Sequence, residues 1–249
     1  MKSNENPRNL WPADPISTLP VVERVKVNEI FYSLQGESTR VGRPCVLVRL
    51  TGCQMRCTWC DTVYSFYQGD WRTFEDILAT VASYDCPIVE LTGGEPLLQP
   101  GSLPLMELLC DAGYEVLLET GGGVDIEPVD QRVRRIVDVK CPASGEVDNN
   151  RWANLEQLRA TDEVKFVLAD RADYDWAKEV CERYRLPERC PVHFSPVVSL
   201  PGVAHGGSTS SSPPGLDPAD LAAWILEDRL RVRLQLQVHK QLWGDKKGV

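Results

Sequence analysis

The chain has 249 residues, of which 43% are hydrophobic and 25% are charged, and its formal net charge is −9. That charge excludes a general electrostatic attraction to nucleic acid, and no apolar run approaches the length that a membrane-spanning helix needs. The N-terminus lacks the basic-then-apolar pattern of a secretory signal, and nine cysteines without an export signal fit reduced thiols and a metal cluster better than disulfides. We therefore expect a cytoplasmic protein that binds neither nucleic acid nor a membrane.

Residues 1–24 contain four prolines and few periodic apolar positions, so they are expected to form an irregular N-terminal arm. Residues 25–249 are expected to form a single domain in which strands and helices alternate. The expected strands are 25–32, 45–50, 88–91, 116–118, 136–139, 164–168, 192–194 and 233–237. The expected helices follow the N-cap residue Thr73 and then cover 103–112, 155–158, 174–184 and about 217–230. Residues 199–215 are rich in Gly, Ser and Pro, which predicts a flexible loop.

This alternation is typical of a parallel α/β sheet or barrel. About six core strands are expected, which is too few to close an eight-stranded barrel. The predicted fold is therefore a partial (β/α)6-type barrel of mostly parallel strands. In such folds the functional site lies at the carboxyl ends of the strands, and three unusual segments follow predicted strands: the cysteine loop 51–62 and the glycine turns at 93–96 and 121–123.

Three thiols lie close together in the first of these segments. Cys53, Cys57 and Cys60 are spaced C-x3-C-x2-C, with Trp59 directly before the last cysteine. Three cysteines on one loop can hold three irons of a cubane cluster, which leaves the fourth iron open to another ligand. A partial zinc site is the alternative, although structural zinc is usually four-coordinate and no second cysteine pair has zinc-site spacing. The other cysteines are interpreted as core or surface residues: Cys45, Cys86, Cys110, Cys141, Cys181 and Cys190.

The turn Gly93-Gly94-Glu95-Pro96 offers a partner for the open iron. Two residues without Cβ allow a ligand to lie against the backbone, whose amides can bond a carboxylate. Glu95 could receive an ammonium group, so the turn suits an amino-acid moiety that chelates iron. The alternative is a tight turn with an exposed glutamate.

Together, these two motifs resemble the radical S-adenosylmethionine superfamily. The resemblance implies a [4Fe–4S] cluster on Cys53, Cys57 and Cys60, with S-adenosylmethionine bound to the fourth iron. Reductive cleavage of that cofactor gives methionine and a 5′-deoxyadenosyl radical. The residues implied to contact the cofactor are Trp59, Cys60, Asp61, Gly93, Gly94 and Glu95.

Further motifs narrow the resemblance to one family. The segments 29–37 (Glu-Ile-Phe-Tyr-Ser-Leu-Gln-Gly-Glu), 60–62 (Cys-Asp-Thr) and 237–240 (Gln-Val-His-Lys) together resemble the 7-carboxy-7-deazaguanine synthase family, over about residues 27–249. This family converts 6-carboxy-5,6,7,8-tetrahydropterin to 7-carboxy-7-deazaguanine with loss of ammonia, in the biosynthesis of queuosine and other 7-deazapurines. The resemblance implies a requirement for Mg²⁺, a homodimer, and an electron donor such as flavodoxin or ferredoxin.

The resemblance also implies roles for individual residues. Arg49 would bind the substrate carboxylate, since a guanidinium matches a carboxylate bidentately, and Thr62 would ligate Mg²⁺ through its hydroxyl. The other residues implied to contact the pterin are Leu34, Gln35, Gly36, Thr92 and His239.

Two segments depart from the family pattern. The usual Ser-Pro-Lys is replaced by Asp138-Val139-Lys140, which are still expected to contact the cofactor, and Gly121-Gly122-Gly123 replaces an Asn-Gly or Gln-Gly turn. Lys165 is expected either near the cofactor or as a solvated strand lysine. The remaining histidines, at 193 and 205, are interpreted as structural or exposed.

Two alternatives to this function stay open on the sequence. A glycyl-radical-activating enzyme shares the C-x3-C-x2-C motif but acts on a protein partner. A non-enzymatic zinc or iron–sulfur protein would need the cysteines alone, and the Gly-Gly-Glu-Pro turn would then have no purpose.

Overall fold

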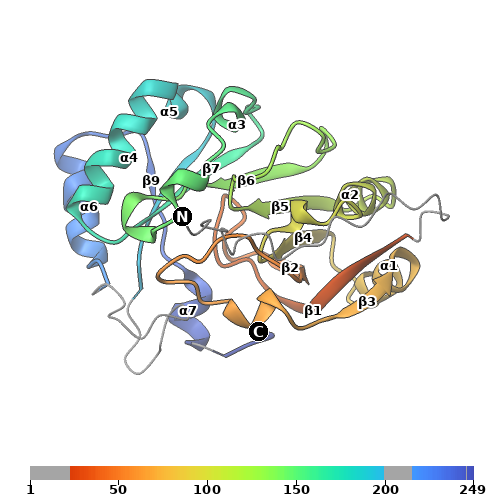
Figure 1. Cartoon of the computed structure of the whole chain (residues 1–249). Helices are drawn as coiled ribbons and strands as arrows, with labels where there is room; N and C mark the ends of the chain where they lie inside the picture. Colours follow the sequence, from red (N-terminus) through yellow and green to blue (C-terminus); the bar gives the residue numbers. More distant parts are fainter. Residues whose placement is uncertain (1–22, 199–214, 245) are drawn as a thin grey trace, which may run out of the picture.

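The computed structural model describes residues 23–198, 215–244 and 246–249, and in them nine strands form one sheet (Figure 1). The strand order is β3-β1-β2-β4-β5-β6-β7-β8-β9. From β2 to β9 all neighbours are parallel, whereas β1 pairs antiparallel with both β2 and β3. The strands are β1 (Arg24–Leu34), β2 (Pro44–Leu50), β3 (Asp70–Thr73), β4 (Ile88–Gly93), β5 (Glu115–Thr120), β6 (Arg134–Asp138), β7 (Glu163–Leu168), β8 (Val192–Pro196) and β9 (Arg233–Leu234).

Seven α-helices accompany the strands in the described residues. In Figure 1, α1 and α2 lie at one end of the sheet, and α4, α5 and α6 lie at the other. Thr73 begins α1 by accepting a hydrogen bond from the Asp76 amide, as predicted, and Gly113 follows α2 with a φ of +91°. The helices are α1 (Phe74–Ala82), α2 (Ser102–Asp111), α3 (Ala153–Glu156), α4 (Arg171–Tyr184), α5 (Leu186–Arg189), α6 (Pro218–Glu227) and α7 (Val238–Trp243).

The two faces of the sheet differ in chemistry because side chains alternate along each strand. On β2, Val46, Val48 and Leu50 pack into the apolar core beneath the helices, whereas Leu47 and Arg49 point to the concave face. The same alternation holds on the other parallel strands, so the helices cover one face and a cavity lies on the other. The predicted partial barrel of mostly parallel strands is confirmed.

The differences from prediction lie in the short elements. β3 was not predicted, and it is a short edge strand that pairs with β1. The last strand was expected to reach residue 237, but β9 ends at Leu234 and α7 follows it. The chain leaves the sheet there because the Gln237 side chain and the Val238 amide bond the β1–β2 loop instead. The arm 1–22, the loop 199–214 and His205 lie outside the described residues.

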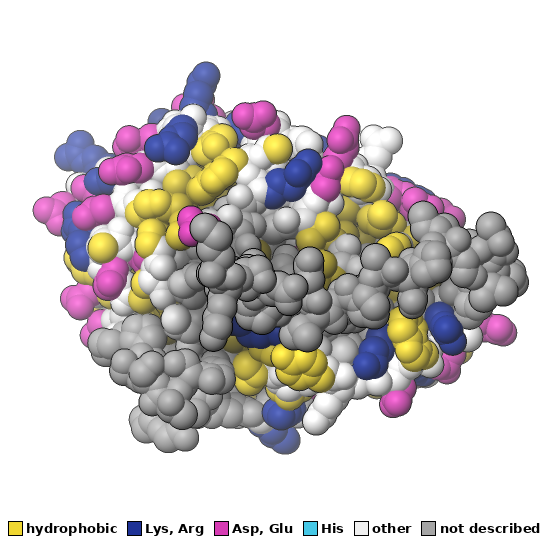
Figure 2. Space-filling model, in the orientation of Figure 1, with side chains coloured by type: hydrophobic (Ala, Val, Ile, Leu, Met, Phe, Trp, Pro, Cys, Tyr) yellow, Lys and Arg dark blue, Asp and Glu magenta, His cyan; other side chains and the backbone are white. Residues whose placement is uncertain are grey.

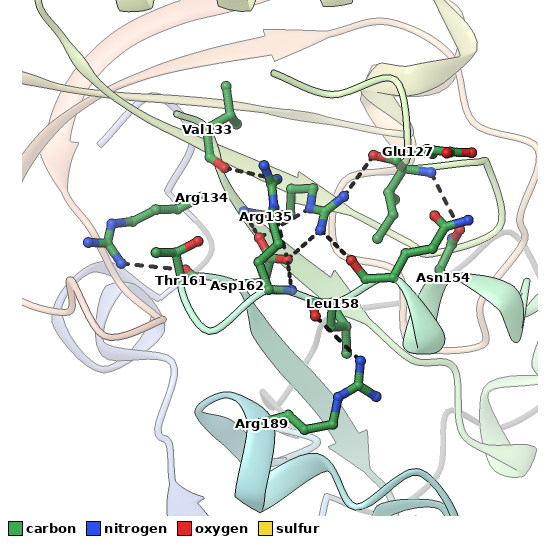
Figure 3. Close-up of polar contacts among 12 residues, drawn as sticks. Glu127, Val133, Arg134, Arg135, Asn154, Leu158, Thr161, Asp162 and Arg189 are labelled. Atoms are coloured by element: carbon green, nitrogen blue, oxygen red, sulfur yellow. Dashed lines mark hydrogen bonds and ion pairs between the residues drawn. The ribbon is translucent and has the colours of Figure 1, made fainter. Parts of the chain in front are cut away.

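A buried ion pair joins the amino ends of β6 and β7, at the opposite end of the strands from the cavity (Figure 3). Arg135 donates from Nε to Asp162 at 3.1 Å and also bonds the backbone carbonyls of Ile126 and Gln157. Both charged side chains are at most 3% exposed. Both charges are paired and hydrogen-bonded, so the Arg135–Asp162 pair joins β6 to β7 at their amino ends.

The surface carries both signs of charge. On the face in Figure 2, Lys and Arg side chains are interspersed with Asp and Glu, and hydrophobic side chains lie between them. No helix in the described part of the chain is long and apolar enough to cross a membrane.

Candidate active site

A cavity of about 450 Å³ opens at the carboxyl ends of the parallel strands. Its wall is formed by the cysteine loop, the turns after β4 and β5, the concave faces of β2 to β7, and α7 with the segment that follows it. Almost all the predicted site residues line it. They are Leu34, Gln35, Gly36, Arg49, Cys53, Cys57, Trp59, Cys60, Asp61, Thr62, Thr92, Gly93, Gly94, Glu95, Asp138, Lys140 and His239.

Val139 is the exception among the predicted residues. Its side chain is 3% exposed and belongs to the apolar core beneath the helices. Its amide donates to the Lys165 carbonyl. A side-chain contact from Val139 to a ligand in the cavity is therefore absent in this arrangement.

The cysteine loop is held open toward the cavity by backbone and side-chain bonds. Arg56 donates to the carbonyls of Cys53 and Met55, and its own amide donates to Glu146. All three cysteines are partly exposed free thiols. Burial raises the pKa of the Cys53 thiol and raises that of Cys57 to about 11, although Lys140 opposes both shifts. Without a metal, ionisation of the Cys53 and Cys57 thiols is therefore disfavoured.

The number of thiols bears on the kind of metal site. Three partly exposed cysteines on one loop can each bind a different iron of a cubane, whereas structural zinc is usually bound by four protein ligands. The residues present therefore suit a [4Fe–4S] cluster.

Glycines allow the turn after β4 to pack against the cysteine loop. Gly93 has a φ of +149°, and a Cβ on Gly94 would lie 2.6 Å from the Cys53 Cβ. The Glu95 amide donates to the Gly52 carbonyl at 2.7 Å. The two motifs that carry the sequence resemblance are therefore in direct contact.

Glu95 is 1% exposed, so the alternative of a turn with an exposed glutamate is wrong. Its carboxylate accepts hydrogen bonds from the Thr120 hydroxyl and from the amides of Leu97 and Gly121. Burial raises its pKa, although these bonds and Lys140 act in the opposite direction. The side chain thus ties the turn after β4 to the start of the glycine turn after β5.

The glycine turn after β5 is close-packed as well. A Cβ on Gly123 would lie 2.8 Å from Met55 Cε and 2.9 Å from the Asn149 carbonyl. The buried Asn154 side chain bonds the carbonyls of Gly122 and Val124 from the other side. A side chain at 123 would therefore clash, whereas a Cβ on Gly121 would lie at least 3.2 Å from its neighbours, so the packing does not explain the departure from the family pattern at 121.

Charged residues on successive strands form the floor of the cavity. Lys165 on β7 pairs with Glu37 at 2.6 Å, with Glu119, and with Asp138 at 3.6 Å. Asp138 also pairs with Lys140 at 2.9 Å. Lys165 is 4% exposed, so the alternative of a solvated strand lysine is wrong.

These neighbours shift the pKa values of the floor residues. Burial alone would lower the pKa of Lys165, but the carboxylates of Glu119, Glu37 and Asp138 raise it. Burial alone would raise the pKa of Glu37, but Lys165 and His239 lower it to about 2. Burial and the carboxylates of Glu119 and Glu37 raise the pKa of Glu90 well above its usual value. The floor therefore contains one carboxyl group whose ionisation is disfavoured, beside ionised pairs.

The mouth of the cavity is joined to the C-terminal segment. Lys240 Nζ lies 2.7 Å from Asp61 Oδ2, and a Cβ on Gly36 would overlap the His239 ring. Thr62 stands at the N-cap of a short 3₁₀ turn, but its side chain makes no capping bond. Its Oγ1 lies 3.7 Å from Cys60 Sγ, so the hydroxyl remains available beside the cysteine loop.

Sequence reasoning missed several residues of this cavity. Glu90, Glu119, Met55 and Tyr64 line it and were assigned no role. A usable signal existed for the first two, since Glu90 lies within a buried, largely apolar strand and Glu119 directly follows three buried apolar residues.

The fold and the cysteine site together define the class of protein. The model of the radical SAM superfamily matches residues 47–186, so the chain belongs to that superfamily. A crystal structure of QueE from Escherichia coli has a TM-score of 0.68 and 23% identity, and the match covers 87% of this chain and 95% of that one. Streptococcus suis SuiB bound to its precursor peptide SuiA has a TM-score of 0.57 and 10% identity, covering 76% and 47%. Both likenesses show the fold.

Sequence comparison narrows the class. A 7-carboxy-7-deazaguanine synthase from Koribacter versatilis is 47% identical over 230 residues, which cover 90% of this chain and 100% of the relative. The protein of the same name from Chlorobaculum tepidum is 43% identical and covers 90% of this chain, with 97% of its own length matched. The chain belongs to the 7-carboxy-7-deazaguanine synthase family.

Proposed function

We propose that this chain is the radical S-adenosylmethionine lyase that converts 6-carboxy-5,6,7,8-tetrahydropterin to 7-carboxy-7-deazaguanine with loss of ammonia, in 7-deazapurine (queuosine) biosynthesis. The observation that carries the proposal is that the cysteine loop, the Gly-Gly-Glu-Pro turn and the strand bearing Arg49 all open into one cavity. Membership of the synthase family favours this function over a glycyl-radical activase or a non-enzymatic metal protein.

Different residues of the cavity would bind the cluster, the cofactor and the substrate. Cys53, Cys57 and Cys60 would hold the [4Fe–4S] cluster, and the backbone of Gly93 and Gly94 would receive the methionyl part of the cofactor. When bound, the cluster and cofactor would supply the deoxyadenosyl radical that takes the hydrogen atom from C6 of the pterin.

The protein's own groups would orient the substrate and stabilise its charge. Arg49 would bind the substrate carboxylate, and the deep polar floor around Lys165 would exchange hydrogen bonds with the pterin ring. Burial and the neighbouring carboxylates raise the pKa of Glu90, and in its protonated form it would donate a hydrogen bond there. Thr62 would provide an oxygen ligand to Mg²⁺ beside the cysteine loop.

Three partners complete the proposal. An electron donor such as flavodoxin or ferredoxin would reduce the cluster, and the active form would be a homodimer. The pterin is the small-molecule partner, and its size suits a cavity of about 450 Å³ that also admits the cofactor's reactive end.

Anaerobic reconstitution tests the proposed function. Protein with a loaded cluster is mixed with S-adenosylmethionine, Mg²⁺, dithionite and 6-carboxytetrahydropterin, and 7-carboxy-7-deazaguanine is measured by mass spectrometry. Formation of that product is expected, and its absence from cluster-loaded protein contradicts the proposal. Cofactor cleavage without product would favour the activase, and bound zinc without iron absorption near about 400 nm would favour a non-enzymatic protein. Omitting Mg²⁺ tests the metal requirement separately.

A further inference from the structure

Arg49 is not a free side chain in the cavity wall. It lies on β2 directly opposite Glu29 on β1, and its Nε donates to Glu29 Oε1 at 2.8 Å. The Arg49 side chain is only 13% exposed. The pairing therefore fixes one edge of the guanidinium, and the ionised Glu29 offsets part of the cost of burying its charge.

Tyr64 holds the same carboxylate from the other side. Its hydroxyl donates to Glu29 Oε1 at 2.8 Å, so one carboxylate oxygen receives both the phenol and the guanidinium. Burial raises the pKa of Tyr64, and Glu29 raises it further against the opposing effect of Arg49, so the phenol remains protonated and can donate.

Aromatic rings confine the guanidinium as well. Its central carbon lies 5.9 Å from the centroid of Phe31 and 6.0 Å from that of Tyr64. The far C-terminal segment completes this packing, since Lys247 Nζ lies 4.0 Å from the centroid of the Tyr64 ring. Contacts of this kind restrict the rotation of the arginine and stabilise its charge.

This arrangement leaves a specific part of Arg49 available. The two terminal nitrogens of the guanidinium have no hydrogen-bond partner within the part of the chain that the structure describes, and the residue lines the cavity. A planar guanidinium whose orientation is already fixed can bind a carboxylate with little further loss of rotamer freedom. The Asp61 carboxylate also acts on the charge of Arg49.

We propose that Glu29 and Tyr64 are positioning residues that hold Arg49 with its terminal nitrogens directed at the substrate carboxylate. The identity of that carboxylate rests on the proposed function; the arrangement of the three side chains does not. Without Glu29, the guanidinium would be free to turn, and selection for a carboxylated pterin would fall.

The test compares two ligands that differ only in the carboxylate. Anaerobic calorimetry on cluster-loaded protein gives the Kd for 6-carboxytetrahydropterin and for tetrahydropterin, which lacks the group. Glu29→Ala should weaken the carboxylated ligand by about 10-fold to 100-fold and leave the other unchanged, because misplacement of a binding group costs factors of this size. Tyr64→Phe, which removes one hydroxyl, should weaken it by about 3-fold.

Two controls separate positioning from structural damage. Glu29→Ala in an Arg49→Met background should cause no further loss, since both changes act through one contact. Glu107→Ala, an exposed glutamate on α2, should leave both Kd values unchanged. If Glu29→Ala does not load a cluster, Tyr64→Phe alone decides.

Two results would contradict the inference. One is that both variants leave both Kd values unchanged, and the other is that the variants weaken both ligands equally, which indicates structural damage. If the wild type binds the carboxylated pterin more tightly than tetrahydropterin but forms no 7-carboxy-7-deazaguanine, the proposed function fails, whereas loss of that selectivity in Glu29→Ala still supports the positioning roles.

Discussion

Lys165 on β7 and Glu37 in the loop between β1 and β2 are 128 residues apart in sequence, and their charged atoms lie 2.6 Å apart in the floor of the cavity. Both side chains are less than 10% exposed. The lysine also neutralises Glu119 and Asp138, so one cation holds together carboxylates from three different parts of the chain. The pair thus joins the loop expected to contact the pterin to the strands expected to contact the cofactor.

Lys165→Met should strongly destabilise the protein. Removing the lysine leaves the buried Glu37 and the partly buried Glu119 without their cation, and loss of one partner of a buried pair typically costs about 3–5 kcal/mol. Urea unfolding of the cluster-free protein measures the difference. Lys178→Met is the control, since Lys178 pairs with Asp228 in a partly exposed bridge and should change stability by less than about 1 kcal/mol. Equal effects from the two variants would show that the floor pairing contributes little.

The same pair predicts a pH dependence. The pKa of Glu37 falls from 4.5 to about 2 on folding, so its contribution is complete above about pH 4.5 and is lost as the pH falls toward 2. A shift of this size corresponds to about 3 kcal/mol. The free energy of unfolding of the wild type should therefore decline between about pH 4.5 and 2. In Lys165→Met the free energy of unfolding should decline less over this interval. An equal decline in the wild type and the variant would show that other carboxylates cause it.

Iron binding should depend on three of the nine cysteines. Cys57→Ala should abolish the iron content and the absorption at about 400 nm after reconstitution, because only two thiolates remain and a second iron of the cubane then has no protein ligand. Cys110→Ala is the control: that thiol is partly exposed on α2 and lies outside the cavity, so iron content should be unchanged. Iron retained in Cys57→Ala would contradict the assignment of the loop.

The sequence allowed prediction of the parallel sheet, and almost all of the site residues predicted from it line the cavity. Strand ends in a parallel sheet meet at one edge, so motifs that follow strands could be placed together without any coordinates. Short elements were harder. β3 and β9 are held by pairing with β1 and β8, and α7 begins where Gln237 bonds Glu37, so their limits depend on distant contacts.

The charged floor of the cavity could be predicted only in part. Glu90 and Glu119 each lie beside buried apolar residues of a strand, which signals a polar inner face, but the bonds from Gln35 to Glu90 and from Lys165 to Glu119 depend on the curvature of the sheet. Likewise, Glu95 looked like a free ligand group, whereas Thr120 and Gly121 occupy it. Bonds between loops that are distant in sequence have no local pattern.

Gly94→Ala should disrupt the contact between the two motif loops. A Cβ at this position would lie 2.6 Å from the Cys53 Cβ and 2.7 Å from the Gly52 carbonyl carbon, so the turn and the cysteine loop must separate. We expect cofactor binding, measured by anaerobic calorimetry, to weaken by at least about 10-fold, since misplacement of a binding site by 1 Å costs this much or more. Gly113→Ala is the control, because its φ of +91° makes alanine strained there by about 1 kcal/mol without touching the cavity. Normal cofactor binding in Gly94→Ala would contradict this contact.

Arg135→Met should lower the free energy of unfolding without lowering the activity of the folded protein. Asp162 would lose its bidentate partner (Figure 3), and the carbonyls of Ile126 and Gln157 would each lose a donor, so the free energy of unfolding should fall by about 3–5 kcal/mol. The pair lies at the amino ends of β6 and β7, so the activity per folded molecule should be unchanged below the unfolding temperature. Arg134→Met is the matched control: this neighbour is partly exposed, bridges Glu115 at 3.3 Å, and should cost less than about 1 kcal/mol. Urea unfolding and product formation, measured on the same preparations, check both expectations. A loss of turnover in fully folded Arg135→Met would contradict them, because it would show that the ion pair at the amino ends of the strands affects the cavity.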